Sequence, residues 1–293
     1  MNTIAPFSRP SPSPVARKAS QRLRRRDVRG RFVPTLASVD RGEPVLFVVS
    51  EMADFIKAGG LGDVAASLPR ALRSACDVRV LIPGYPEVLS RLRSIEVVGS
   101  VAPRGHLPAC RIGRALQTDG LPIYVLLNGP LFDREGSPYV DAAGKEWKDN
   151  AIRFATLSHA AAEIAAGRTG MDWAPGLLHL NDWPTALAAA YVRWDGTEVA
   201  TLLTIHNLAY QGLFPYALAE ALGIPAEHLE EMHFFGHMSF LQAGIVNATR
   251  LNTVSLHYAE QITAPADGCG LDALLARRAA RGHLSGIVNG IDA

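Results

Sequence analysis

The first patterned part of the chain alternates short apolar runs with a segment of helical periodicity. Residues 45–50 form a continuous apolar run rich in β-branched side chains, which is typical of a strand buried on both faces. Residues 62–75 carry apolar side chains at helical spacing, and Pro69 is expected to kink or shorten that helix. A second apolar run follows at 78–82. Strand, helix and strand in this order predict a βαβ unit and therefore a parallel sheet.

The alternation continues to the end of the chain. Further strands are predicted at 123–127, 176–180, 199–205, 251–254 and 284–288, and further helices at 150–166, 184–194, 239–247 and 271–280. The segment 85–120 is less regular and is a candidate for antiparallel pieces. Phe234, Phe235 and Phe240 are expected to fill the core. We predict one α/β domain over residues 42–293, with a doubly wound parallel sheet whose ligands bind beyond the carboxyl ends of the strands.

Charge is distributed unevenly along the chain. Residues 1–41 hold ten basic and two acidic side chains, a net charge of +8, whereas the remainder holds 19 basic and 26 acidic ones. Rich in Pro, Ser and Arg and without apolar periodicity, residues 1–41 are predicted to be a disordered basic tail. A transit peptide and an unused upstream start are the alternatives. The net charge of +1 argues against a nucleic-acid binder.

Cysteine usage favours a protein of a reducing compartment, and hydropathy predicts no membrane-spanning segment. The three cysteines, Cys76, Cys110 and Cys269, lie far apart, so no disulfide framework is expected and a cytoplasmic protein is favoured. A transit peptide at 1–41 would instead indicate a plastid. Neither a secretory signal nor a transmembrane run of about 18 apolar residues is predicted. The histidines share no spacing with acids that would make a metal site, and we expect neither a metal nor a cofactor.

A glycine-rich loop follows the first predicted strand. Lys57 precedes Gly59, Gly60 and Gly62, just before the helical segment. Paired glycines let backbone N–H groups approach an anion, the helix N-terminus adds a favourable dipole, and the lysine adds a cation. This pattern favours phosphate binding, although its spacing fits neither the dinucleotide fingerprint nor the P-loop. A plain glycine-rich turn is the alternative.

Two further polar groups follow predicted strands. Asp182 comes after the strand at 176–180, where it is equally a candidate N-cap for the next helix. His206, followed by Asn207, comes after the strand at 199–205, where a hydrogen-bonded structural histidine is the alternative. Because the carboxyl ends of parallel strands meet at one edge of a sheet, Lys57, Asp182 and His206 are expected to converge there.

Together these motifs resemble those of the bacterial glycogen synthases and plant starch synthases, which transfer glucose from ADP-glucose to an α-1,4-glucan. The matching segments are KAGGLGDV (57–64), NDW (181–183), TIHNLAYQG (204–212), FGHMSFLQAG (235–244), NTVS (252–255), GCGL (268–271) and NGID (289–292). They keep the family's order, so the resemblance is more specific than any single motif. One departure is Asn181, which stands where the family usually has His.

The resemblance implies the Rossmann-like N-terminal half of a GT-B glycosyltransferase, a hexosyltransferase that retains the configuration of the transferred glucose. Asp182 and His206 are the implied catalytic positions, beside that glucose. The implied substrate-binding positions are Lys57, Gly59, Gly60, Asp63, Tyr139, Asn207 and Asn289. Among these, Lys57 is implied to contact the donor diphosphate, and Asn289 to reach the donor from the junction with a second domain.

The chain stops one residue after the NGID segment, where the second domain of the family begins. The resemblance therefore implies that the C-terminal domain is absent, in a fragment or a truncated gene product. The expected partners are ADP-glucose and an α-1,4-glucan such as glycogen or starch, with neither nucleic acid nor membrane. The alternative function is a truncated, non-catalytic glucan-binding or regulatory protein, which would bind glucan without turnover.

Overall fold

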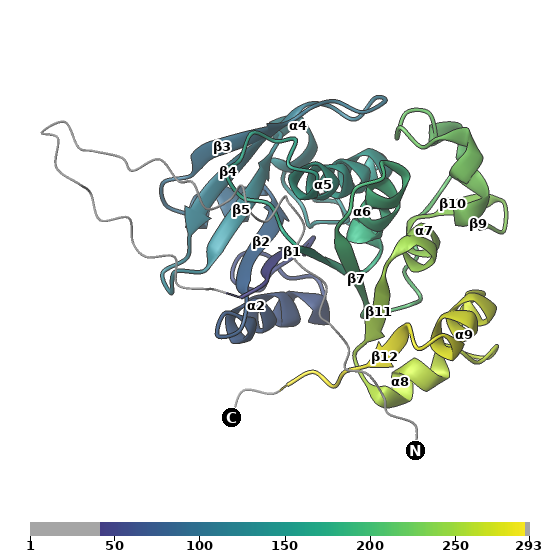
Figure 1. Ribbon diagram of the computed structural model, residues 1–293. Helices are drawn as coiled ribbons and strands as arrows, with labels where there is room; N and C mark the ends of the chain where they lie inside the picture. The colour runs from purple at the N-terminus through teal and green to yellow at the C-terminus, as the bar shows by residue number, and fades with distance from the viewer. Residues whose placement is uncertain (1–41, 291–293) are drawn as a thin grey trace, which may run out of the picture. The chain divides into compact units, whose positions relative to one another are not determined.

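The structure is a computed structural model that describes residues 42–290, so the predicted tail at 1–41 lies outside the described residues. Within this span, nine strands form one sheet in the order β12–β11–β7–β6–β1–β2–β5–β4–β3 (Figure 1). Their bounds are β1 (Pro44–Val48), β2 (Asp77–Pro83), β3 (Glu96–Val101), β4 (Cys110–Leu116), β5 (Pro122–Leu127), β6 (Leu177–Asn181), β7 (Ala200–Ile205), β11 (Arg250–Thr253) and β12 (Leu284–Gly286). Neighbours pair in parallel from β12 to β5, whereas β4 pairs antiparallel with both β5 and β3.

The direction of winding reverses next to β1. From β1 the chain runs through α2 (Gly60–Leu72) to β2 on one side, whereas β6, on the other side, leads through α6 (Trp183–Trp194) to β7. Because such crossovers are right-handed, opposite directions place the helices on opposite faces. Figure 1 shows α2 on one side of the sheet and α5 (Asn150–Ala165) and α6 on the other. The predicted doubly wound sheet is confirmed, and its switch point lies between β1 and β6.

Helices α5, α6 and α7 (Phe240–Asn247) pack side by side over one face of the sheet. Gly244 in α7 permits the close approach to α6, because a Cβ atom there would lie 2.7 Å from that of Ala186. The other helices are α3 (Pro86–Arg91), α4 (Gly129–Phe132), α8 (Leu256–Gln261) and α9 (Asp272–Ala280), with 3₁₀ turns η1 (Tyr216–Leu218) and η2 (Ala226–Met232). No helix within residues 42–290 is both long and apolar enough to cross a bilayer.

The patterned elements appear where the sequence predicts them, with differences at their ends. The helix predicted at 62–75 begins at Gly60, continues through Pro69 and ends at Leu72. Pro69 is tolerated there because it lies with Leu61 and Ala65 on the buried stripe, where packing compensates for the missing N–H. The candidate antiparallel pieces within 85–120 are β3 and β4, and the last strand ends at Gly286.

A second, smaller sheet has three short antiparallel strands in the order β8 (Leu213–Phe214), β10 (His237–Ser239) and β9 (His233–Phe234). Phe240 is buried as predicted, and Phe234 is half-buried. The prediction that Phe235 fills the core is wrong, because its side chain is 78% exposed. Phe235 lies in the turn between β9 and β10 with φ +44°, a conformation that bulky residues seldom adopt, and the turn directs it away from the core.

Candidate functional site

Polar residues follow the carboxyl ends of three neighbouring strands. The loop at residues 49–59 follows β1, Asp182 follows β6 and His206 follows β7. These strands lie side by side in the order β1–β6–β7, so the three segments are neighbours at the switch point of the sheet.

Asp182 links the end of β6 to the end of β7. Its Oδ1 atom accepts the backbone N–H of His206 at 2.7 Å and that of Asn207 at 3.4 Å. Asp182 occupies the N-cap position of α6, but its side chain makes no capping hydrogen bond, which removes the helix-cap alternative. Its backbone has φ 55° and ψ −174°, a conformation that costs a non-glycine residue roughly 1–3 kcal/mol and recurs at functional sites.

Burial shifts the protonation of both Asp182 and His206. It raises the pKa of Asp182 to about 7, although the N–H groups of His206 and Asn207 act in the opposite direction. It lowers the pKa of His206 to about 4. The imidazole is therefore neutral near pH 7 while the carboxyl group is partly ionised, a pairing typical of functional sites.

Asn181 orients the imidazole of His206. The Asn181 Oδ1 atom lies 3.0 Å from His206 Nε2, and the Asn181 Nδ2 atom donates to the carbonyl of Val48 at 3.1 Å. Because Oδ1 can only accept, this network assigns the hydrogen of the neutral ring to Nε2 and leaves the lone pair on Nδ1. His206 therefore offers a hydrogen-bond acceptor to a ligand.

The loop after β1 presents a lysine and an open helix N-terminus. Lys57 Nζ lies 2.7 Å from Asp63 Oδ2, and the two side chains are 49% and 61% exposed. Such an exposed pair contributes little to stability, so Lys57 can exchange Asp63 for a ligand at small cost. Gly59 has an extended backbone, and a Cβ atom at Gly60 would meet nothing within 4 Å. Neither glycine is required by the turn itself, and the space before α2 is open to a ligand.

The family model of the starch synthase catalytic domain matches residues 44–277, the span that holds nearly all of these elements. The chain belongs to the starch synthase catalytic domain family. The glycogen synthase of Xanthomonas campestris pv. campestris (strain 8004) is 70% identical over 248 residues, which cover 85% of this chain and 52% of that protein. The glycogen synthase of Pseudomonas savastanoi pv. phaseolicola is 52% identical over 250 residues, with the same two coverages.

A solved structure supports the same assignment. The catalytic domain of starch synthase IV from Arabidopsis thaliana, bound to ADP and acarbose, has a TM-score of 0.71 and 27% sequence identity. The match covers 86% of this chain and 52% of that one. The fold is thus a Rossmann-like half of a GT-B glycosyltransferase, and the chain spans about half the length of the curated relatives it matches.

Most of the predicted site residues of this starch synthase catalytic domain come together at the switch point. Hydrogen bonds join Asp182, His206 and Asn207 directly. The loop after β1 carries Lys57 and Gly59, and the first turn of α2 carries Gly60 and Asp63. Tyr139 joins them through its hydroxyl group, 2.8 Å from Ser50 Oγ at the end of β1. Asn289 is set apart, because it is exposed beyond β12, the edge strand two places from β7.

The loop that carries Tyr139 is fixed by a buried arginine that the sequence did not single out. Arg153 in α5 is 1% exposed and donates to the carbonyls of Leu131 at 2.9 Å and Pro138 at 2.7 Å. Asn150 adds a bond from its Nδ2 to the Tyr139 carbonyl at 2.9 Å. Together these hydrogen bonds from α5 hold Tyr139 against the end of β1. No sequence signal marks Arg153, because its acceptors are carbonyls from a distant loop.

Glu51 is the second residue that the sequence did not single out. It is 2% exposed at the end of β1, and its carboxylate accepts the N–H groups of Ala58 and Gly59. An acid directly after a buried strand was the available signal, since strand ends of this sheet type carry ligand-binding loops.

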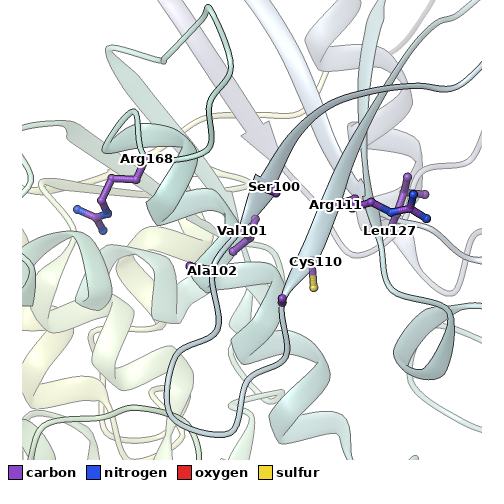
Figure 2. Close-up of a pocket in the computed structure, with 8 residues that line it drawn as sticks. Ser100, Val101, Ala102, Cys110, Arg111, Leu127 and Arg168 are labelled. Atoms are coloured by element: carbon purple, nitrogen blue, oxygen red, sulfur yellow. The ribbon is translucent and has the colours of Figure 1, made fainter.

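A separate cavity of about 440 Å³ lies between the ends of β3 and β4, lined in part by Cys110, Arg111 and Arg168 (Figure 2). None of the predicted site residues lines it. Arg111 and Arg168 lie on opposite sides and point away from one another, and Arg168 is paired with Glu163 and Asp195. We therefore place the candidate site at the switch point. Between Gly42 and Gly290, no cluster of three or more His, Cys, Asp or Glu side chains is suited to a metal.

Proposed function

We propose that this domain forms one wall of an enzyme that transfers glucose, with retention, from ADP-glucose to the non-reducing end of an α-1,4-glucan. The observation that carries the proposal is the bonded pair of Asp182 and His206 at the switch point, beside the open N-terminus of α2. The family membership and the ADP bound to the Arabidopsis relative support the choice of donor. Such an enzyme would work in the cytoplasm.

The donor diphosphate takes the place of Asp63 as the partner of Lys57. Gly59 and Gly60 leave room for its oxygens at the N-terminus of α2, where backbone N–H groups and the helix dipole favour an anion. Before the donor binds, the ion pair with Asp63 keeps Lys57 beside the N-terminus of α2. Asn289, which lies beyond the edge strand β12, reaches the donor from the junction with a second domain.

The transferred glucose lies against Asp182 and His206. The Asp182 Oδ2 atom has no hydrogen-bond partner among residues 42–290, and His206 Nδ1 carries a lone pair, so both can accept from sugar hydroxyls. Asn207 and Tyr139 border the same space. As the bond between C1 and the phosphate oxygen breaks, its electrons go to ADP and positive charge develops at C1. A carboxylate already held by backbone groups stabilises that charge without rearrangement.

The glucan 4-hydroxyl then forms the new bond to C1 from the face that ADP leaves. Its proton passes to the departing phosphate oxygen, so atoms and charges balance. The work of this domain is therefore positioning and charge stabilisation.

The test joins this chain to the C-terminal half of the Xanthomonas campestris glycogen synthase and supplies labelled ADP-glucose and glycogen. We expect label in the glycogen, and about 10²-fold less when Asp182 is changed to Asn. Glycogen binding without any incorporation would contradict the proposal and favour a non-catalytic glucan-binding protein.

A further inference from the structure

Glu51 is a buried acid without a role in the transfer described above. Its side chain is 2% exposed, yet its nearby cation, Lys57, forms its ion pair with Asp63 instead. The Glu51 Oε2 atom accepts the backbone N–H of Ala58 and, at 3.2 Å, that of Gly59. A buried carboxylate that is satisfied by backbone amides fixes the course of that backbone.

The residues that Glu51 holds immediately precede the candidate phosphate site. Helix α2 begins at Gly60, with Gly59 as its N-cap. The first N–H groups of a helix have no partner within the helix, and those of Gly60 and Leu61 make no hydrogen bond within the described part of the chain. Glu51 bonds the two preceding amides, and the amide of Gly62 also acts to lower its pKa, so the carboxylate engages amides on both sides of Gly60 and Leu61 and leaves those two for a ligand.

We propose that Glu51 is a positioning residue for the donor: its carboxylate holds residues 58–59 so that Lys57 and the free amides of Gly60 and Leu61 face one anion. This inference rests on the proposed function and names the residue that shapes its phosphate site. Glu51 itself does not touch the donor.

The charge of Glu51 makes the proposal testable, because charge and position act in opposite directions. A carboxylate beside a diphosphate repels it, so charge alone predicts tighter donor binding when Glu51 is neutralised. Loss of loop position predicts weaker binding. The titratable groups that interact with Glu51 are Lys57, Tyr85, Tyr139 and Asp182, from four separate segments. Among them, Glu51 raises the pKa of Asp182 by repulsion.

Two substitutions separate the effect of the Glu51 charge from the effect of its side-chain length. Glu51→Gln keeps the size of the side chain and removes its charge, whereas Glu51→Asp keeps the charge and shortens the reach by one methylene group. The matched control is Glu163→Gln in α5. It removes another buried carboxylate, which is 6% exposed and paired with Arg168. Calorimetric titration of the chain with ADP then measures the dissociation constant of each variant.

We expect both Glu51 variants to bind ADP about tenfold or more weakly than the wild type, and the control to bind equally well. Tighter or unchanged binding by the Glu51 variants would overturn the proposal. Should Glu51→Gln fail to fold, Glu51→Asp decides the same question.

A second measurement separates positioning from general loss of structure. In ¹³C NMR titrations, Asp182 should titrate at a lower pH in Glu51→Gln than in the wild type, and should change little in Glu51→Asp and in the control. An unchanged Asp182 titration in Glu51→Gln would overturn the placement of Glu51 beside this site. The proposed function fails separately, if the enzyme joined to the C-terminal half incorporates no label. Should the wild-type chain alone bind no ADP, the role of Glu51 is judged by hydrogen exchange at Ala58 and Gly59, the two amides that it bonds, which must be faster in both Glu51 variants than in the wild type and the control.

Discussion

The Oδ1 atom of Asp182 accepts the backbone N–H of His206 at 2.7 Å, across the ends of two neighbouring parallel strands. The bond fixes the carboxylate with a backbone group, so its position does not depend on a flexible partner. The same strand ends carry Asn181, which holds the His206 ring from the other side. Asp182 and His206 are thus positioned as one unit.

Replacement of Asp182 by Asn should lower kcat by about 10²-fold or more in the enzyme that carries this domain. Asn is the informative substitution, because it tolerates the positive φ of this position and its side-chain oxygen can still accept from His206. The change therefore removes charge and little else. Steady-state kinetics together with thermal melting measure the two effects separately.

The control for this substitution is Asp195→Asn at the other end of α6. Asp195 pairs with Arg104 at 2.8 Å, away from the strand ends. We expect Asp195→Asn to lower the melting temperature and to leave kcat nearly unchanged. An Asp182→Asn enzyme with normal kcat would remove Asp182 from the catalytic step.

The raised pKa of Asp182 should be visible in the pH dependence of the free energy of unfolding. Its pKa is about 7 in the folded chain and about 4 in an unfolded one. Between these values only the unfolded state ionises, so the wild type loses stability as pH rises through this window, and the loss is complete above it. Asp182→Asn lacks this titration. Its free energy of unfolding relative to the wild type should therefore rise from about pH 4 to about pH 8, by up to about 4 kcal/mol.

Denaturant unfolding of both proteins across this range checks the prediction. Titrating groups that do not interact with Asp182 behave alike in the two proteins and cancel in the difference. A difference that stays constant with pH would mean that Asp182 ionises as an ordinary carboxylate.

Replacement of Lys57 by Ala should weaken donor binding about ten- to a hundredfold, because hydrogen bonds to charged groups are strong. Lys57→Arg should restore only part of the affinity, since a planar guanidinium does not reproduce a compact ammonium group. The KM for ADP-glucose measures the effect. Lys145→Ala, at an exposed lysine of another loop, serves as control and should leave KM unchanged. An unchanged KM in Lys57→Ala would exclude Lys57 from the donor site.

The hydrogen bond between Tyr139 and Ser50 should be measurable by a double-mutant cycle. Tyr139→Phe removes the hydroxyl group and preserves the packing on Trp183 and Phe154. Ser50→Ala removes the other partner, which is fully buried. We expect a coupling energy of about 1 kcal/mol from the unfolding free energies of the two single variants and the double variant. Strictly additive effects would show that the two hydroxyl groups do not interact in solution.

The arrangement of the sheet was predictable because its signals are local. The apolar runs at 45–50 and 78–82 specify buried strands by composition, and the helical period between them specifies a crossover. Parallel strands then bring their carboxyl ends to one edge, which is why Lys57, Asp182 and His206 could be expected to converge.

The functions of individual side chains at that edge were decided only by the tertiary structure. The sequence leaves Asp182 equally suited to cap α6, and the pairing of β6 with β7 decides instead that it accepts from His206. Glu51 accepts the N–H groups of Ala58 and Gly59 because the loop folds back on the end of β1. Phe235 is exposed because the turn between β9 and β10 directs it outward. Hydrophobic periodicity states which face of an element is buried. It cannot state which polar atoms meet across a sheet edge, because those partners are set by the packing of segments far apart in the chain.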